Sequence, residues 1–575
     1  MSRAGGAADG TPLAAAGRGG DEPAAGRRGG LYGLLLRDSV IYGSGRMLQK
    51  FLSALLLPLY TSYLTPADYG VLGMVLVTAT FIDVIVTLGF DVAFARFFFD
   101  EPSDAHRSNV VTNVFYIDTV YPGILLGLLA LFMPQISHVI MGQGGYALYF
   151  DVALVNVFFT NWSDLAFQLF RLEHRPYIFT VFNLGRIVVQ IPLTVVLVVA
   201  FRMGVMGVLV GNAVTAFLIC MGGLPTYWRR LNWRPDPGLL RPMFAFAIPA
   251  VFTGLVFFLL KLSDRFFLMR YRGQKEVGLY TAAFTISQPV YLAMTAFRMA
   301  WPQWHYARLH EPERHKQLVA RSSTYFLFVC VAMLVLQGAF MPLLVRVLLR
   351  QPAFWVVGPT TLLLTIATVA YSAYFVFWTG ANVAKKNRLI PVITAVASGL
   401  NIGLNFLLVP KYGMIAAAWT TLIGYIVLAA LMYPISEHYY PIPFEWARFL
   451  KLGAAATLSL LAAWGIAAAT HESASMPFGQ LAWRETLKLA AVLLFPLALG
   501  ALHFFTPGET ARLHTAVTRV GRLLRPGAPA ARAAASGSAL PGARGLDAEA
   551  AAAEDDELVL ENEARLTINE ADSPT

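Results

Sequence analysis

LPLYTSYLTPADYGVL, at residues 57–72, returns in altered form as RFFLMRYRGQKEVGLY at residues 265–280. The two stretches align at an offset of 208 residues, which places Gly70 opposite Gly278. Low identity makes this match weak when it is taken alone, because turns that contain glycine resemble one another between unrelated helices.

A second pair of stretches strengthens the match. FRMGVMGVLVGNAVTAF at 201–217 aligns with PKYGMIAAAWTTLIGYI at 410–426, at an offset of 209 residues, and Gly204 then stands opposite Gly413. Two matches at nearly one offset predict an internal repeat.

The composition is that of a membrane protein. Apolar residues make up 57% of the chain and charged residues 14%, against about 45–50% and about 25% in soluble proteins. About fourteen apolar stretches are long enough to cross a bilayer as helices. They lie at roughly 39–64, 70–92, 109–133, 148–170, 177–201, 204–226, 242–262, 277–299, 322–345, 355–380, 389–409, 413–435, 447–469 and 485–505.

The repeat and the spans together predict an all-α integral membrane fold. Six spans separate equivalent helices, and an even number gives parallel repeats, so we expect two six-helix lobes around a central cavity and two extra helices. The predicted parts are a disordered cytoplasmic tail (1–38), an N-lobe (39–226), a cytoplasmic linker (227–241), a C-lobe (242–435), the last two spans (436–505) and a second disordered tail (506–575). An excess of Lys and Arg in alternate loops predicts that both termini are cytoplasmic.

Several function classes are excluded. The two cysteines, Cys220 and Cys330, lie in apolar runs and cannot form a disulfide framework or a multi-cysteine metal site. The basic residues sit in short loops without a nucleic-acid-binding signature. The chain has no phosphate-binding loop, zinc motif or nucleophile elbow, and its short loops leave no room for a glycosyltransferase site. We therefore expect neither an enzyme nor a bound cofactor.

Six ionisable residues lie inside spans of the first half. Each would cost about 2.5–3.5 kcal/mol at a lipid-facing helix centre, so we expect them to face protein or water. They are Arg46, Lys50, Asp83, Asp118, Asp164 and Arg186.

The basic pair Arg46 and Lys50 stands four residues apart on one helix face, where like charges repel. An anion would relieve this repulsion, and so would an ion-pair network with Asp83 and Asp118; the sequence leaves both open. Arg and Lys suit a phosphate group, whereas the buried carboxylates would serve as carriers of a coupling proton or Na⁺ or as partners in structural ion pairs.

The end of span 7, the repeat partner of span 1, carries Lys261, Asp264 and Arg265. Arg298, at the end of span 8, is expected to extend toward the membrane surface. Aromatic residues near the expected cavity could stack on sugar rings, although packing in the core is the commoner role. They are Tyr42, Trp162, Tyr371, Tyr374 and Trp378.

Four segments carry a resemblance to a known family: GSGRMLQKFLSALLLPLYTSYLTPADYG (43–70), LGFDVAFARFFFDEP (88–102), LSDRFFLMRYRGQKEVGLYTAAF (262–284) and KYGMIAAAWTTLIGY (411–425). Over about residues 35–505 the chain resembles the polysaccharide-biosynthesis branch, the Wzx-like O-antigen and exopolysaccharide flippases, of the multidrug/oligosaccharidyl-lipid/polysaccharide (MOP) exporter superfamily.

The resemblance implies a transporter that moves undecaprenyl-diphosphate-linked oligosaccharide from the inner to the outer leaflet of a bacterial cytoplasmic membrane. It implies a cationic cavity for the diphosphate, to which we assign Arg46, Lys50, Arg186, Lys261 and Arg265. Asp83, Asp118, Asp164 and Asp264 are assigned to ion coupling, by H⁺ or Na⁺, or to charge pairing. Membrane lipids, a polysaccharide polymerase and chain-length machinery are the expected partners.

Two other functions stay open. A flippase for lipid-linked peptidoglycan precursor would need a similar cationic cavity, and sequence separates it poorly from the first reading. A multidrug exporter of cationic compounds would instead need an acidic cavity, which the pair Arg46 and Lys50 disfavours.

Overall fold

The computed structural model describes residues 56–306, 309, 311–470, 476–506 and 509–510, and the regular elements in these ranges are helices. They are α2 (Leu57–Tyr63), α3 (Pro66–Val86), α4 (Phe90–Phe97), α5 (Asp104–Leu131), α6 (Met133–Met141), α7 (Ala147–Leu172), α8 (Pro176–Val195), η1 (Val196–Ala200), α9 (Gly204–Trp228), α10 (Pro237–Leu262), α11 (Asp264–Arg272), α12 (Gln274–Ile286), α13 (Gln288–Tyr306), α14 (Pro312–Ala339), α15 (Met341–Leu348), η2 (Pro352–Val357), α16 (Gly358–Val383), η3 (Asn387–Leu389), α17 (Ile390–Tyr439), α18 (Trp446–Ala469) and α19 (Phe478–Ala501).

The all-helical membrane fold predicted from the sequence is confirmed. Nine helical segments in the described part of the chain are long and apolar enough to cross a membrane. The count of fourteen spans stays a prediction. The predicted site residues Arg46 and Lys50, the tail at 1–38 and almost all of the tail at 506–575 lie outside the described residues.

The internal repeat is visible in the helix boundaries. Helix α3 begins at Pro66 and α12 at Gln274, so the two starts are separated by the offset found in the sequence. At the second matched turn, Gly204 has φ +58° and Gly413 has φ +61°. Side chains disfavour this left-handed backbone, which explains why glycine occupies both positions of the repeat.

Local sequence sets where these helices start. The Thr65 hydroxyl accepts a hydrogen bond from the Asp68 N–H, and the Asp68 carboxylate accepts one from the Thr65 N–H. Helix α3 therefore begins with a complete capping box, and Pro66 fills its first helical position. In the other half, Gly413 breaks the α17 backbone, and the Glu276 carboxylate accepts the freed N–H of Met414 at 2.9 Å.

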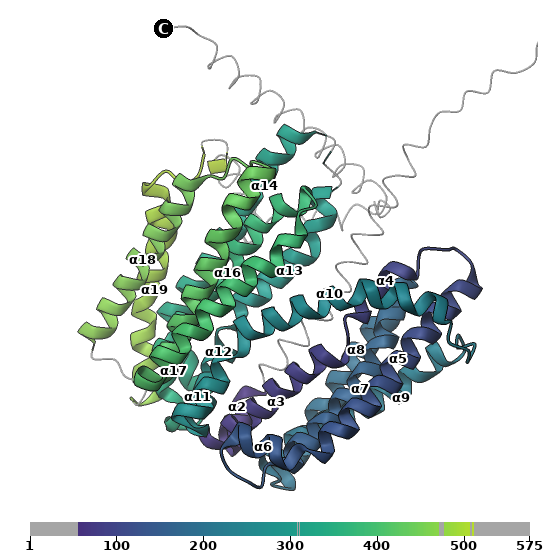
Figure 1. Cartoon of the computed structure of the whole chain (residues 1–575). Helices are drawn as coiled ribbons and strands as arrows, with labels where there is room; N and C mark the ends of the chain where they lie inside the picture. Colours follow the sequence, from purple (N-terminus) through teal and green to yellow (C-terminus); the bar gives the residue numbers. More distant parts are fainter. Residues whose placement is uncertain (1–55, 307–308, 310, 471–475, 507–508, 511–575) are drawn as a thin grey trace, which may run out of the picture. The chain divides into compact units, whose positions relative to one another are not determined.

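We call α2–α9 the N-lobe and α10–α17 the C-lobe. Figure 1 shows that α10 runs between the two groups of helices. Its first half joins the apolar core of the N-lobe through Met243 and Ala247, and its second half packs against α17. The site residues at its end are therefore held by the C-lobe.

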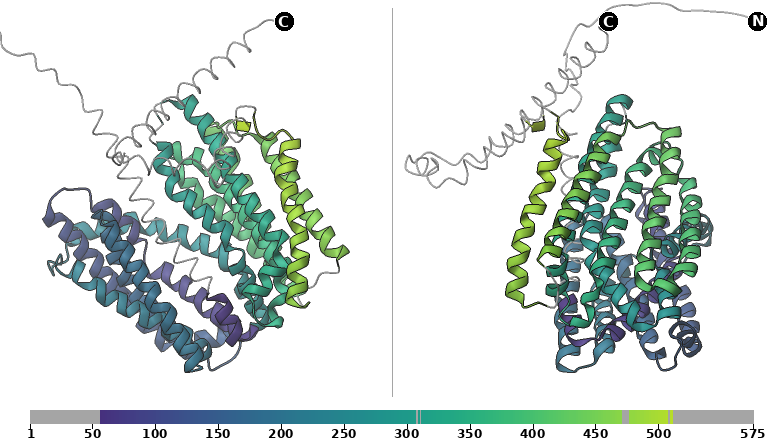
Figure 2. Two further views of the ribbon diagram at one scale, coloured as in Figure 1. Left: turned by 180° about the vertical axis from the view of Figure 1, so that it is seen from behind. Right: turned by 90° about the vertical axis from the view of Figure 1, so that its left-hand side faces the viewer.

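The last two helices, α18 and α19, form a pair that packs on α14 (Figure 2). Sequence placed the last span at 485–505, but α19 already begins at Phe478. The charged residues Glu485 and Lys488 pair at 3.2 Å within the helix, and both side chains are only 2% exposed, so they do not interrupt it.

Candidate functional site

The junction between α10 and α11 holds a buried ion pair. Asp264 and Arg265 are each 2% exposed, and the Arg265 guanidinium lies 3.3 Å from the Asp264 carboxylate. The Arg265 backbone N–H also donates to this carboxylate, at 3.0 Å. The side chains of two sequence-predicted site residues are thus directly in contact.

Two hydroxyl groups complete this network. Tyr280 of α12 and Thr421 of α17 both donate to the second oxygen of Asp264, the threonine at 3.2 Å. The Arg265 guanidinium also lies 4.4 Å from the centre of the Phe284 ring. The network therefore ties α11, α12 and α17 together, and Asp264 neutralises Arg265. Sequence analysis missed Tyr280 and Thr421, because only the fold brings them to Asp264.

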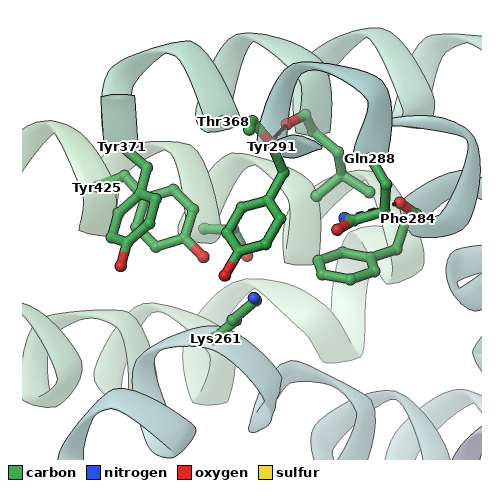
Figure 3. A pocket seen from close by; sticks show the side chains of 9 residues that line it. Lys261, Phe284, Gln288, Tyr291, Thr368, Tyr371 and Tyr425 are labelled. Atoms are coloured by element: carbon green, nitrogen blue, oxygen red, sulfur yellow. Dashed lines mark hydrogen bonds between the residues drawn. The ribbon is translucent and has the colours of Figure 1, made fainter. Parts of the chain in front are cut away.

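A pocket lies beside this network. Lys261, on the last turn of α10, extends into it from one side, and Tyr291, Tyr371 and Tyr425 line the facing side (Figure 3). Gln288 adds a further polar group. The pocket contains about 280 Å³ of space when its open mouth is included.

Lys261 differs from Arg265 in its surroundings. Its ammonium group lies 4.1 Å from the centre of the Tyr291 ring, and no carboxylate within the described ranges lies within ion-pair distance of it. A cation that is held over an aromatic ring and lacks an acidic partner can receive an anionic ligand.

The interior of the N-lobe is acidic. Asp83 on α3 and Asp118 on α5 are each within electrostatic reach of Asp164 on α7 and of Asp91 on α4. Sequence analysis selected three of these residues and missed Asp91, which lies at the very end of the predicted span 70–92. Asp118 is only 7% exposed, whereas Asp164 and Asp91 are exposed, so these carboxylates extend from the buried interior to an open surface.

The remaining predicted cation of the N-lobe, Arg186, lies on α8 and is half-buried. The structure does not bring it into an ion pair with the described carboxylates. Asn183, one turn earlier on the same helix, instead donates to the backbone of Phe179 at 2.8 Å.

The two lobes cross at Gly70 and Gly278, the glycines matched by the repeat. A Cβ atom at Gly70 would overlap the backbone carbonyl of Gln274, and a Cβ at Gly278 would overlap the carbonyl of Pro66. One turn further on, a Cβ at Gly73 would come within 2.7 Å of the Thr281 hydroxyl. The backbones of α3 and α12 are therefore in direct contact, which requires glycine at the crossing.

Polar contacts gather at the same end of the lobes. The Thr61 hydroxyl donates to the carbonyl of Leu348 at 3.2 Å and accepts the N–H of Arg350 at 3.1 Å. The Gln274 amide donates to the Tyr146 hydroxyl at 2.8 Å. This end of the interface is packed and hydrogen-bonded across the lobes.

A histidine pair lies beyond the predicted span 277–299. His305 and His315 are fully buried, and their ring centres are 5.7 Å apart. Burial, together with the neighbouring His315, lowers the pKa of His305 from 6.5 to about 4. The Nδ1 atom of His315 is 2.7 Å from the Tyr440 hydroxyl. This cluster joins α13 and α14 to the end of α17.

Comparisons with known proteins give a family match for part of the chain and a shared fold. Residues 35–301 match the sequence profile of the family described as polysaccharide biosynthesis protein. A comparison with curated protein sequences finds no match.

Solved structures share the fold. One is the lipid II flippase MurJ in an inward closed conformation, with 12% sequence identity, a TM-score of 0.62, and coverage of 80% of this chain and 98% of the other. Another is a multidrug resistance MATE family transporter in an inward-facing conformation, with 14% identity and a TM-score of 0.55. The match covers 70% of this chain and 97% of the other. A third is a MOP superfamily transporter from Pyrococcus furiosus whose binding pocket is described as having reverse polarity, with 14% identity, a TM-score of 0.50, and coverage of 71% and 95%.

At these identities the structural likeness establishes the fold. The chain is a multi-pass membrane protein whose described part shares the fold of MOP superfamily transporters, and its residues 35–301 match the polysaccharide-biosynthesis family. This is the family that the sequence predicts.

Proposed function

We propose that this protein is a flippase for an undecaprenyl-diphosphate-linked oligosaccharide. It would move the repeat unit from the inner to the outer leaflet of a bacterial cytoplasmic membrane, for the synthesis of O-antigen, exopolysaccharide or capsule. The family match supports a role in polysaccharide synthesis, and membrane lipids, a polymerase and chain-length machinery would be its partners. Both termini would lie in the cytoplasm.

The observation that carries this proposal is the unpaired cation of the C-lobe pocket. Lys261 has a tyrosine ring beneath it and no acidic partner in the described part of the chain, so its charge is available to a phosphate group. Asp264 is paired with Arg265, so it does not compete with the phosphate group for Lys261. The other predicted cations, Arg46, Lys50 and Arg186, would extend the basic lining toward the N-lobe.

Transport would proceed by alternating access. The backbones of α3 and α12 touch at Gly70 and Gly278, and separation of this contact would let the lobes rock apart to release the cargo. Parallel repeats suit such rocking, because each lobe can move as one packed unit about the contact between them.

The carboxylates of the N-lobe would couple transport to an ion. Asp83 and Asp118 each lie within electrostatic reach of Asp164, so binding a proton or Na⁺ would relieve the repulsion between these like charges. Ion binding in one lobe and cargo binding in the other would then be linked through the crossing of the lobes.

Specific observations favour two other functions. The fold is similar to that of a lipid II flippase, whose cargo class would use the same cation. The acidic interior of the N-lobe would suit the cationic substrates of a multidrug exporter. The three functions differ in the chemical class of the molecule that is transported, so identifying that molecule would distinguish them.

Deletion of the gene in its native bacterium tests the proposal. We expect a lipid-linked oligosaccharide to accumulate on the cytoplasmic leaflet, and mass spectrometry of the extracted lipids would identify it. Accumulation of peptidoglycan precursor would favour the second function. Normal lipid pools together with new sensitivity to cationic drugs would favour the third.

A further inference from the structure

The first turn of helix α15 is held by the last helix, α19. Its N-cap residue, Phe340, provides no side-chain acceptor for the first N–H groups of α15, and such groups have no partner within their own helix. The Glu485 carboxylate of α19 supplies one, because it accepts the backbone N–H of Leu343 at 3.1 Å. The start of α15 is therefore fixed by a side chain 142 residues further along the chain.

The Glu485 side chain is buried together with its counter-charge. Its second oxygen lies 3.2 Å from the Lys488 ammonium group, and both side chains are 2% exposed. A buried ion pair can often be replaced by apolar residues of similar volume without loss of stability, so the burial of α19 does not require this one. An apolar pair, however, could not accept the N–H of Leu343. The contact with α15 is what the charged pair adds to the packing of α19.

A second contact attaches α15 to the same region. The Arg346 guanidinium donates to the backbone carbonyl of Met476, just before α19 begins. It also lies 5.7 Å from the centre of the Phe478 ring and 5.3 Å from the centre of the Trp355 ring in η2, distances at which a cation is attracted to an aromatic face. Helix α15 is thus attached to the beginning of α19 at two points.

The opposite end of α15 contacts the N-lobe. The Leu348 carbonyl accepts a hydrogen bond from the Thr61 hydroxyl at 3.2 Å, and the same hydroxyl accepts the N–H of Arg350 at 3.1 Å. The Trp355 indole donates to the carbonyl of Leu349 at 2.8 Å, which holds η2 against the end of α15.

Helix η2 extends this contact to the crossing of the lobes. Phe354 is fully buried, and the centre of its ring lies 6.0 Å from that of Tyr69 on α3. Tyr69 precedes the crossing glycine Gly70 in the sequence. We call the series of contacts from Glu485 through Leu343 and Leu348 to Thr61 the α15 linkage.

The length of α15 makes its two ends depend on one another. Leu343 and Leu348 are separated by about 7.5 Å along the helix axis. A helix this short moves as one body, so a displaced first turn also displaces the carbonyl that Thr61 contacts. Hydrogen bonds weaken steeply once their distance and angle depart from the preferred range. The contact between Glu485 and Leu343 therefore affects whether Thr61 can bind both of its partners.

We propose that Glu485 is a positioning residue for alternating access. It fixes the first turn of α15, and α15 then places the Leu348 carbonyl and the Arg350 N–H against Thr61. The helix pair α18 and α19 thereby stabilises the contact between the two lobes. This inference rests on the alternating access of the proposed function and gives the last two helices a role in it.

Distances between the lobes test this inference in the full-length protein in lipid nanodiscs. Spin labels on cysteines introduced at Val139 in α6 and at Val356 in η2 would report the separation of the lobes by double electron–electron resonance. These side chains are 79% and 57% exposed, so labelling should not disturb the packing, and the native cysteines are buried. The quantity measured is the ratio of separated lobes to lobes in contact.

Two variants of the ion pair isolate the acceptor from the charge. Glu485→Leu with Lys488→Leu removes the acceptor of Leu343 and leaves no buried charge, so we expect the ratio to rise about fivefold, the size of one lost hydrogen bond. Glu485→Gln with Lys488→Leu is the matched control, because its amide oxygen can still accept this N–H. The control should stay within about twofold of the parent.

A third change shows whether Glu485 acts through Thr61. Thr61→Val should also raise the ratio about fivefold, because it removes the hydroxyl and keeps the shape of the side chain. Combined with Glu485→Leu and Lys488→Leu it should add less than about twofold, since both changes break the same linkage. A purely structural role of Glu485 would lower the unfolding temperature and leave the ratio unchanged.

The remaining outcomes decide between the claims. An unchanged ratio in the apolar variant, an equal rise in its Gln control, or effects that multiply fully with Thr61→Val would overturn the inference. Glu485→Asp, which keeps the charge and shortens the side chain, should also raise the ratio, so a failure of the apolar variant to fold does not prevent the test. Glycolipid transport by the wild-type protein would leave the proposed function standing in each case. Lobes that keep one distance in every variant, together with absent transport, would overturn the proposed function itself.

Discussion

The two lobes share a backbone plan and differ in the charge of their interiors. The N-lobe gathers Asp83, Asp118 and Asp164 from three helices. The C-lobe instead presents Lys261 over the ring of Tyr291. Both lobes contribute a glycine to the crossing: Gly70 of α3 contacts α12, and Gly278 of α12 contacts α3. The two lobes therefore share the glycine crossing and differ in the charged side chains that they carry.

Substitution of the crossing glycines, Gly70 and Gly278, should reduce transport more than any other change, and by the same amount in either lobe. In Gly70→Ala or Gly278→Ala the new methyl group overlaps a backbone carbonyl of the other helix, so the helices must separate. We expect transport to fall to background in both variants. A disulfide cross-link between cysteines introduced at Ser62 and Gln351, whose amide donates to the Ser62 carbonyl at 3.3 Å, should form less readily than in the parent.

Gly399→Ala is the control for this prediction, because no atom lies within 4 Å of the added Cβ. The two native cysteines are buried and should add little background to the cross-linking. Full transport in either crossing variant, or an effect confined to one lobe, would break the equivalence of the two glycines.

The next largest effect should come from the ion pair of the C-lobe. Asp264→Asn leaves Arg265 buried without its counter-charge, which should cost about 3–5 kcal/mol of stability. Thermal unfolding of the purified protein in detergent would measure this loss. The double variant Asp264→Asn with Arg265→Gln should recover part of it, and strictly additive losses would show that the two side chains do not act as a pair.

The N-lobe should respond in the opposite way. Asp118→Asn removes one of several like charges, so we expect the free energy of unfolding to stay within about 0.5 kcal/mol or to rise. Transport should lose its dependence on the ion gradient while binding of the cargo remains. A loss of several kcal/mol would instead indicate that a cation such as Arg46 or Lys50 neutralises Asp118, which is the alternative that the sequence leaves open.

The last effect concerns pH and requires no substitution. Burial lowers the pKa of His305 from 6.5 to about 4 in the folded protein, so the unfolded chain binds more protons than the folded one between these pH values. The contribution of His305 to stability should therefore be complete well above pH 6.5 and should decrease as the pH falls, by about 1.4 kcal/mol at pH 5.5. Thermal unfolding in His305→Gln should show a weaker dependence over this range. An unchanged pH profile in this variant would assign the dependence to other groups.

The fold could be predicted further than the site because a repeat leaves a signal along the chain. The offset between Gly70 and Gly278 can be found in the sequence alone. The starts of α3 and α12 are separated by the same offset. The sequence was less informative about where a helix begins, since α19 starts at Phe478, before the predicted span 485–505. Glu485 and Lys488 pair with each other, which makes both compatible with a buried helix.

The site was predicted where its residues are neighbours in sequence. Asp264 and Arg265 are adjacent in the sequence, so their contact could be expected without knowledge of the fold. Tyr280 and Thr421 come from other helices, and nothing in their own surroundings marks them as ligands of Asp264. Arg298 was expected to extend toward the membrane surface, and this stays a prediction; its side chain is exposed.

The most direct test is transport of undecaprenyl-diphosphate-linked oligosaccharide across proteoliposomes that contain only this protein. The account predicts that the wild-type protein moves the glycolipid between leaflets, that Lys261→Gln reduces this rate at least tenfold, and that Tyr412→Leu, at a residue 65% exposed on α17, does not change it. Wild-type vesicles that move the glycolipid no faster than empty vesicles, or a Lys261→Gln variant with the full rate, would contradict it.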